Sequence, residues 1–191
     1  MTNKREAILD ATIDRIAEQG FSFSTVQIAS DVGCSQSLVF RYFPTKEKLI
    51  SESFNKVCRE LELALKQVKL PDVLTRESLN DYIMEEWGVY CSYLSSNGRI
   101  AKAYLYFVAK GTRFPRGFRS AEAVIKRLLG NRYDMIMTVY PDFLFVAEYL
   151  LMVSNVVASG KFVDWRSQPD SIAKLKDVLR NGIYGMGQAK A

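Results

Sequence analysis

Apolar residues recur at helical spacing along nearly the whole sequence, whereas the alternating pattern of a half-buried strand is almost absent. Leu9, Ile13, Ile16 and Ala17 form the first such stripe, and Gly20 follows at a position that commonly ends a helix. Helices of this kind bury their apolar stripes by packing on one another. The sequence therefore predicts an all-α fold of about nine helices.

Glycine, proline and capping residues predict where these helices begin and end. Ser24 and Gln27 have the spacing of a capping box, and Ser167, Pro169 and Asp170 give another helix-start signal. After the first helix, the predicted helices span about residues 24–33, 35–43, 45–68, 75–96, 100–110, 118–139, 141–159 and 167–182. A loop is predicted at 111–117.

The chain has 191 residues, of which 48% are apolar, so it can bury a sizeable core without disulfide bonds. This length predicts one domain, or a small domain attached to a larger one. Charged residues make up 25% of the sequence, which is ordinary for a soluble, ordered protein. The net charge of +5 is compatible with a nucleic acid or an acidic partner and is specific for neither.

Histidine does not occur in the sequence, which removes the commonest general base and the commonest metal ligand. A Ser-His-Asp or Cys-His catalytic site within this chain is therefore excluded, as is a zinc site of the HExxH type. Cys34, Cys58 and Cys91 have neither metal nor redox spacing, and we expect them to be small buried residues in a reducing cytosol. We expect no enzyme activity, no metal and no cofactor.

Two segments bear on localisation. The first ten residues lack the apolar run of a signal peptide. The most apolar stretch, Phe143 to Ala158, is short for a membrane span and contains Glu148, Ser154 and Asn155. We therefore expect a cytoplasmic protein with no membrane partner.

The segment from Thr25 to Tyr42 has the spacing of two short helices that cross steeply. Ala29 is small enough for close contact between two helices. Gly33 tolerates the positive φ that a tight turn between them requires. This pattern predicts a helix-turn-helix, whose second helix enters the major groove of DNA.

The second helix of this motif is predicted to direct Val39 and Phe43 to the core, with Tyr42 close by. Its other face is predicted to present Gln36, Ser37, Phe40 and Arg41. Glutamine can bind adenine through two hydrogen bonds, arginine can bind guanine, and an aromatic edge can contact a thymine methyl group. The alternative is an ordinary three-helix cluster whose polar face is solvated.

Lys46 and Tyr42 are expected to lie near DNA phosphates. Lys46 falls in the first turn of the following helix, where a cation opposes the helix dipole. Such an unfavourable position suggests a role outside the fold.

Several short motifs between residues 5 and 54 match one protein family. They are Ile8-Leu-Asp-Ala-Thr, Glu18-Gln-Gly-Phe, Thr25-Val-Gln-Ile-Ala, Gly33-Cys-Ser and Tyr42-Phe-Pro-Thr-Lys-Glu-Lys-Leu49. On these motifs the segment resembles the N-terminal domain of the TetR family of bacterial transcriptional repressors. Beyond residue 54 the likeness rests on helix count and chain length.

The resemblance implies a DNA-binding domain over residues 1–46 and an effector-binding and dimerisation domain over 47–191. The sequence departs from the family at Ser37, where glycine is usual, at Phe40, where tyrosine is usual, and at Cys34, which replaces a small apolar residue. DNA binding is expected, to an operator whose sequence these residues leave undefined. The positions that match the DNA contacts of the family are Thr25, Gln27, Ser35, Gln36, Ser37, Leu38, Phe40, Arg41, Tyr42 and Lys46.

The stretch from Phe143 to Ala158 is apolar nearly all round, which is typical of a helix buried on more than one side. One side can meet the core of its own chain, and the other predicts a partner. With a second stripe near the C-terminus, it predicts a four-helix interface between two identical chains. The alternative is a helix at the centre of a monomer. The candidate interface residues are Phe145, Leu150, Val153, Ile172, Leu175, Leu179 and Ile183.

Aromatic and soft side chains at helical spacing are candidates for an effector pocket, which the family likeness implies for this part of the chain. The same pattern is common in plain cores, and the sequence leaves both interpretations open. We expect an apolar or aromatic ligand. The candidate residues are Trp87, Tyr90, Cys91, Tyr104, Phe107, Tyr133, Met137, Tyr149 and Met152.

A run of basic residues extends from Arg99 to Arg132, with nine basic residues and one acid, Glu122. Residues 1–70, by contrast, contain ten basic and nine acidic residues. The run is compatible with a solvated face, with a site for an anionic group of the effector, or with a second surface facing DNA.

Together these features favour a dimeric repressor that binds a palindromic DNA operator and is released by a small-molecule effector. One alternative is a dimeric helical adaptor that does not bind DNA. Another is an enzyme of the helical body, although no paired-acid or nucleophile motif supports it.

Overall fold

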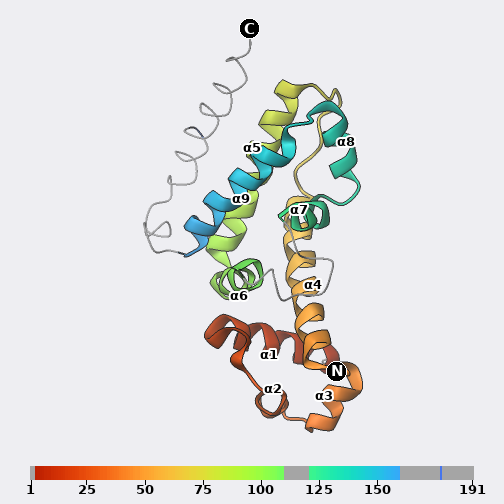
Figure 1. Ribbon diagram of the computed structural model, residues 1–191, viewed down its shortest axis with the longest axis vertical. Coiled ribbons are helices and arrows are strands. Elements are labelled where there is room, and N and C mark those ends of the chain that lie inside the picture. The colour runs from red at the N-terminus through yellow and green to blue at the C-terminus, as the bar shows by residue number, and fades with distance from the viewer. Residues whose placement is uncertain (1–2, 110–120, 160–176, 178–191) are drawn as a thin grey trace. The chain divides into compact units, whose positions relative to one another are not determined.

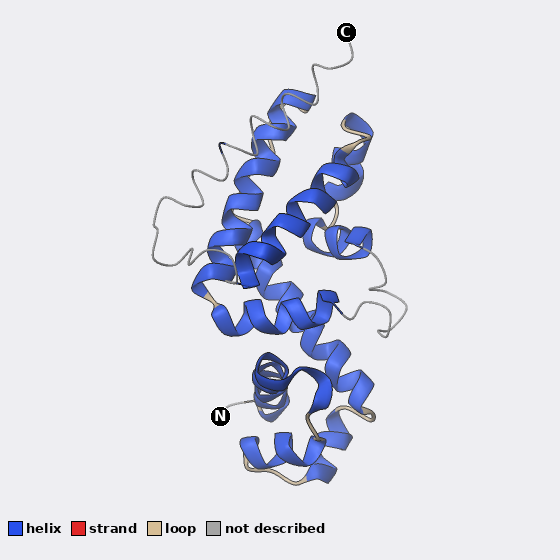
Figure 2. Cartoon of the chain, turned by 60° about the vertical axis from the view of Figure 1, so that its left-hand side comes forward, coloured by secondary structure: helices blue, strands red, loops and turns tan. Residues whose placement is uncertain are grey.

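The computed structural model describes residues 3–109, 121–159 and 177. Over these residues the chain forms nine α-helices, one short 3₁₀ helix and no strand (Figures 1 and 2). The all-α prediction is therefore confirmed. The helices are α1 (Lys4–Gln19), η1 (Gly20–Ser22), α2 (Thr25–Val32), α3 (Gln36–Tyr42), α4 (Lys46–Leu65), α5 (Arg76–Ser96), α6 (Gly98–Ala109), α7 (Ala121–Leu129), α8 (Arg132–Val139) and α9 (Phe143–Ser159).

The chain divides into two compact units. Unit 1 consists of Met1–Glu60 and Asn97–Ser120, and unit 2 consists of Leu61–Ser96 and Ala121–Ala191. Helix α4 contributes to both units, and α6 belongs to unit 1 although α5, which precedes it, belongs to unit 2. These units differ from the division predicted at residue 46, which concerns DNA binding and remains a prediction.

Helix α1 ends where Gly20 adopts a φ of 66°, a conformation that favours glycine. A Cβ atom at this position would also lie 3.0 Å from the ring of Tyr106 on α6. Backbone conformation and close packing therefore both require glycine here. The close approach reflects the packing of α6 directly on α1 within unit 1.

The core of unit 1 is formed by the apolar stripe of α1 together with aromatic residues of α4 and α6. The ring of Phe54 on α4 lies 4.8 Å from that of Phe107 and 6.4 Å from that of Tyr104, both on α6. At the rim of this core, Arg99 of α6 forms an ion pair with Asp14 of α1 at 3.0 Å. Helix α6 is therefore fixed to the N-terminal helices by both apolar and ionic contacts.

In unit 2, α9 packs on α5 and α7 (Figure 1 shows α5 and α9 side by side). The indole N–H of Trp87 on α5 donates to the Ser154 hydroxyl at 2.7 Å and to the Leu150 carbonyl at 3.1 Å, both on α9. These hydrogen bonds give the buried indole N–H of Trp87 its acceptors and join α5 to α9.

One predicted helix, over residues 118–139, was wrong in its extent. Two helices, α7 and α8, occupy the described part of this range because Gly130 adopts a φ of 57°. The N–H of Gly130 donates to the Lys126 carbonyl at 2.9 Å and closes α7. The left-handed conformation of this glycine ends α7 and turns the chain. The sequence predicted one helix because apolar residues continue at helical spacing on both sides of Gly130.

The predicted loop at 111–117 and the predicted helix at 167–182 lie outside the described residues, apart from residue 177. Among the described helices, none is long and apolar enough by itself to cross a membrane. Helices α8 and α9 together reach that length and composition, with a bend of 118° between them.

Candidate functional site

Helices α2 and α3 form the predicted helix-turn-helix through local hydrogen bonds. The Ser24 N–H donates to Gln27 Oε1 at 2.7 Å, and the Gln27 N–H donates to Ser24 Oγ at 3.2 Å, which completes the predicted capping box. Gly33 ends α2 in the left-handed conformation, with φ 63° and ψ 54°. Ala29 is buried, as expected for a small residue at a close helix contact.

The two faces of α3 differ as the sequence predicts. Val39 and Phe43 are fully buried, whereas Phe40 is 40% exposed and Tyr42 is 41% exposed. The exposed face of α3 thus combines aromatic and polar side chains. The exposed residues Gln36, Ser37, Phe40 and Arg41 are called the recognition face below.

Polar side chains at the start of α3 are already oriented by their neighbours. The Gln36 amide donates to the Thr25 hydroxyl at 2.8 Å, and the hydroxyls of Ser35 and Ser37 lie 2.9 Å apart. Thr25 is buried, and its implied contact with DNA remains a prediction. The implied contacts of Gln27 and Leu38 with DNA remain predictions; the side chain of Gln27 serves the capping box, and Leu38 is half-buried.

Arg41 differs from the other cations around this motif. Arg5 donates to Glu52 at 3.1 Å, and Lys48 lies 2.9 Å from the same carboxylate. Arg15 binds Asp31 through two hydrogen bonds of 2.7 Å. The Arg41 guanidinium is exposed and forms no ion pair or hydrogen bond with any residue that the structure describes. It is therefore available to an external acceptor.

Lys46 has a role inside the fold that the dipole argument did not predict. Its ammonium group donates to the backbone carbonyl of Phe21 at 2.8 Å and to that of Phe23, and it lies 4.4 Å from the centroid of the Phe23 ring. These carbonyls follow the end of α1, where acceptors lack intrahelical partners. Lys46 thus ties the start of α4 to the segment between α1 and α2, and its contact with DNA remains a prediction.

Replacing Lys46 with methionine is expected to lower the free energy of unfolding by about 1–3 kcal/mol, because hydrogen bonds from a charged group to carbonyls are lost. Urea unfolding followed by circular dichroism measures this loss. Lys48→Met is the matched control, because Lys48 is exposed and only forms a surface pair. Equal stability of the Lys46 variant and the wild type would contradict the structural role. If the log–log slope of DNA affinity against salt concentration is smaller by about 1 in the Lys46 variant, Lys46 also contacts a DNA phosphate.

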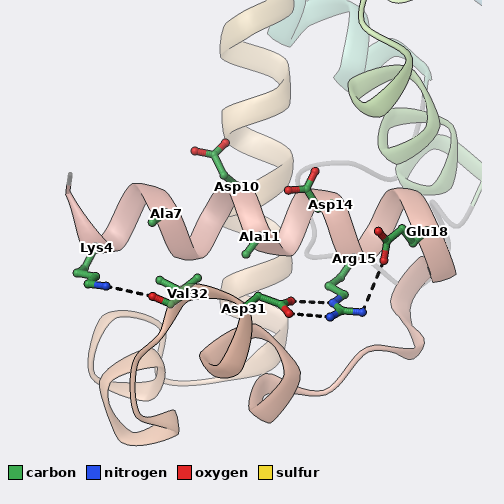
Figure 3. Close-up of a pocket in the computed structure, with 9 residues that line it drawn as sticks. All are labelled: Lys4, Ala7, Asp10, Ala11, Asp14, Arg15, Glu18, Asp31 and Val32. Carbon is green, nitrogen blue, oxygen red and sulfur yellow. Dashed lines mark hydrogen bonds and ion pairs between the residues drawn. The ribbon is translucent and has the colours of Figure 1, made fainter.

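A pocket in unit 1 lies between α1 and α2 and is mainly acidic (Figure 3). The Arg15 guanidinium, hydrogen-bonded to Asp31, lowers the pKa of that carboxyl group. Four acidic and two basic residues make the surface unsuited to phosphate, and no three acidic, Cys or His side chains among the described residues are placed to hold a metal ion. The lining residues are Lys4, Ala7, Asp10, Ala11, Asp14, Arg15, Glu18, Asp31 and Val32.

Unit 2 contains a cavity of about 70 Å³ between α4, α5, α7 and α9. Trp87 and Tyr90, two of the predicted effector residues, are in its wall. The other lining residues are aliphatic or aromatic, with the single exception of Glu86. Sequence reasoning missed most of this wall because it searched for aromatic and soft residues and passed over aliphatic ones. The full lining is Leu65, Ile83, Glu86, Trp87, Tyr90, Ile125, Leu128, Leu129, Phe143, Ala147, Leu150 and Leu151.

The other predicted effector residues of unit 2 do not line this cavity. Cys91 and Tyr133 are buried elsewhere in the core of the unit, and Met137 is half-buried. Tyr149 and Met152 are 37% and 58% exposed on the outer side of α9. Helical spacing predicts which residues lie on the same face of a helix, but it does not predict which helix faces pack against each other.

Tyr104 and Phe107 were also predicted to line an effector pocket. Both are buried in the aromatic core of unit 1, against Phe54. They do not line the cavity of unit 2 because α6, which carries them, packs on α1.

Glu86 is held by two donors that converge on one of its carboxylate oxygens. The Tyr82 hydroxyl and Arg132 Nη1 each donate to Glu86 Oε1 at 2.6 Å. Burial raises the pKa of Glu86, and the hydrogen bonds from Tyr82 and Arg132 act against that rise. The spacing of Tyr82 and Glu86 on one helix face could be found in the sequence, whereas Arg132 is too distant in sequence to be paired with them by any spacing rule.

The helix-turn-helix carries the clearest relation to known proteins. The family described as "Bacterial regulatory proteins, tetR family" matches residues 8–52 of this chain, which include α2, α3 and the turn between them. This segment of the chain belongs to the TetR family. TetR-family proteins are transcriptional regulators and not enzymes, in agreement with the expectation from the sequence.

Relatives extend the TetR likeness beyond the helix-turn-helix. The HTH-type transcriptional regulator BetI of Klebsiella pneumoniae (strain 342) is 28% identical over 131 residues, which cover 67% of this chain and 65% of the length of that protein. A TetR family transcription regulator from Marinobacter aquaeolei VT8 has a TM-score of 0.68 at 16% identity, covering 93% of this chain and 94% of its own. A TetR-like transcriptional regulator from Rhodococcus sp. RHA1 has a TM-score of 0.69 at 17% identity, covering 95% and 96%. These two structures share the fold of this chain.

Proposed function

We propose that this TetR-family protein is a cytoplasmic, dimeric repressor that binds a palindromic DNA operator and leaves it when a small molecule binds in unit 2. The observation that carries the proposal is the recognition face of α3. It presents exposed polar and aromatic side chains on a helix whose opposite face is buried in unit 1. A dimer would place two such helices in successive major grooves, about 34–36 Å apart.

The recognition face has the chemistry to read base edges. The guanidinium of Arg41 can form two hydrogen bonds with guanine, and the amide of Gln36 can do so with adenine. The hydrogen bond from Gln36 to Thr25 fixes the amide before DNA arrives. Phe40, exposed and without a hydroxyl, suits a thymine methyl group.

Selection of bound sequences from random DNA, with the full chain, tests the proposal directly. We expect one enriched palindrome, bound with an affinity that falls steeply with salt, at a log–log slope of about −0.9 per phosphate neutralised. The alternative of an adaptor that does not bind DNA would give no enriched sequence and no such slope. Repeating the selection with added small molecules tests release.

Arg41→Ala is expected to weaken binding to the selected operator by about 1–3 kcal/mol and to relax the preference at one base pair. Fluorescence anisotropy with the operator and with single-base variants measures both effects. Arg59→Ala, which removes an exposed arginine of α4, is the matched control and should leave binding to the operator unchanged. An equal loss on all sequences would instead make Arg41 a phosphate contact.

The outer side of α9 supports the proposed dimer. Phe145, Tyr149 and Met152 are 68%, 37% and 58% exposed and recur at helical spacing, so they form one apolar stripe. Leu150, predicted as an interface residue, is instead buried within unit 2, and Val153 is half-buried. The remaining interface candidates, Ile172, Leu175, Leu179 and Ile183, lie outside the described residues.

Phe145→Glu is expected to convert the dimer into a monomer at micromolar concentration, because it would place an unpaired charge in an apolar interface. Sedimentation velocity over a series of protein concentrations measures the change. Leu63→Glu is the control, since Leu63 of α4 is 67% exposed and equally apolar. A Phe145 variant that stays dimeric, or a wild type that is already monomeric, would remove this stripe from the interface.

The basic run from Arg99 to Arg132 gives no support to an anionic effector group in the cavity. Arg99 pairs with Asp14, Lys126 with Glu122, and Arg132 with Glu86. Lys102 and Arg127 are exposed, and no residue of the cavity wall is basic. The other basic residues of the run, Lys110, Arg113, Arg116 and Arg119, lie outside the described part of the chain.

A further inference from the structure

We infer that the cavity of unit 2 selects an uncharged apolar ligand with one hydrogen-bond donor, a hydroxyl or an amide N–H, which is read by the second carboxylate oxygen of Glu86. The inference concerns the chemistry of the ligand. It rests on the proposed function only for the step in which this ligand would release DNA.

The wall of the cavity offers one polar feature in an apolar surround. Trp87, Tyr90 and Phe143 supply aromatic surface, and most other lining residues are aliphatic. Glu86 is 7% exposed and is the one lining residue with a charged side chain. Within the described residues, both hydrogen bonds to its carboxylate reach Oε1 and none reaches Oε2. Oε2 is thus an acceptor that no donor of the described residues reaches, and a ligand that supplies a donor there gains a hydrogen bond.

Charge balance decides which kind of donor fits. Glu86 and Arg132 form a neutral pair with an N–O distance of 2.6 Å. An anionic ligand would be repelled by the carboxylate and would lose its hydration without compensation. A cationic ligand would leave a net positive charge in the core unless Arg132 withdrew, and Arg132 is also held by the Leu129 carbonyl at 3.2 Å. A neutral donor satisfies Oε2 and leaves the pair intact.

The size of the cavity limits the ligand. At about 10–15 Å³ for each water position, a cavity of about 70 Å³ holds only a few water molecules or a group of similar size. This is smaller than the pockets of about 300–1,000 Å³ that enclose drug-sized ligands. The site therefore suits a short alcohol or amide, or the end of a longer chain.

The test uses the full chain with four small probes of similar size: n-butanol, its isomer methyl propyl ether, butylammonium and butyrate. Trp165→Phe leaves Trp87 as the only tryptophan, so its fluorescence reports events at the cavity. We expect n-butanol to bind at least about tenfold more tightly than the ether, because a hydrogen bond to a charged acceptor is gained. The two ions, at constant ionic strength, should give no saturable change.

Three variants locate the effect. Glu86→Gln replaces one carboxylate oxygen with an N–H group, so the preference for alcohol over ether should disappear. Glu85→Gln, which alters the exposed neighbour on the same helix, should keep it. Ala147→Leu fills the cavity from α9 and should abolish binding of both probes. If Glu86→Gln fails to fold, Ala147→Leu still tests the site, because this variant leaves the ion pair between Glu86 and Arg132 intact.

Equal affinity for the alcohol and the ether would overturn the inference, as would tighter binding of the ether or of either ion. Binding of n-butanol that survives Ala147→Leu would also overturn it, because the site would then lie elsewhere. These measurements involve no DNA. A chain that selects no DNA sequence would therefore reject the proposed repressor without affecting this result, and a failure here would leave DNA binding untouched.

Discussion

Replacing Arg132 with methionine is expected to lower the free energy of unfolding by about 3–5 kcal/mol at neutral pH, because it leaves the buried carboxylate of Glu86 without its cation. The side chains of Arg132 and Glu86 are only 16% and 9% exposed, so water cannot replace the lost partner. Thermal or urea unfolding followed by circular dichroism measures the difference. Arg127→Met, at an exposed site on α7, should change stability little.

The pH dependence of this variant provides a second check. Without Arg132, burial raises the pKa of Glu86 further above its ordinary value of 4.5. The folded variant then binds more protons than the unfolded chain, so its stability falls as the pH rises through this range. The difference from the wild type should shrink on acidification and vanish below about pH 4. The double variant with Glu86→Met should recover much of the stability; a loss that is independent of pH and persists in the double variant would contradict this account.

Phe107→Ala is expected to destabilise unit 1 by about 3–5 kcal/mol, as is typical for truncating a buried aromatic residue. Phe107 is 4% exposed, and its ring lies 4.8 Å from Phe54 and 5.6 Å from Phe21. DNA binding should be lost together with folding, although Phe107 is not on the recognition face. Urea unfolding and operator binding, measured on the same samples, test whether the two losses coincide.

Lys102→Ala is the control for this prediction, because Lys102 is exposed on the same helix. Phe107→Leu should lose less stability than Phe107→Ala, since it keeps more of the buried volume. A Phe107→Ala variant that folds normally, binds DNA and no longer responds to the effector would contradict a core role and would return Phe107 to the effector site.

Local features of the helix-turn-helix were predictable from the sequence because each rests on neighbouring residues. The capping box of Ser24 and Gln27 and the left-handed turn at Gly33 depend only on side chains a few positions apart. The division of α3 into a buried face, with Val39 and Phe43, and an exposed face follows from helical periodicity. The family match over residues 8–52 covers the same local pattern.

Features that join distant segments were not predictable in this way. Lys46 reaches carbonyls more than twenty positions earlier, at Phe21 and Phe23, and no propensity rule relates them. Arg132 meets Glu86 across 46 positions. Gly130 lies inside a continuous helical pattern, where an isolated glycine is tolerated, so the pattern alone did not predict the turn. In each case tertiary packing selects one of several local options.

The packing of α6 on α1 limits which segments can be exchanged between regulators of this kind. A fragment that ends after α4 would deprive Phe54 and Phe21 of Phe107, the aromatic residue that both contact on the helix that begins at Gly98. A chimera that joins the reading helices of this chain to the body of another must therefore carry the matching α6, or must redesign the α1 surface that receives it. In such proteins, DNA specificity would change by point substitution on the recognition face of α3 more readily than by recombination of whole segments.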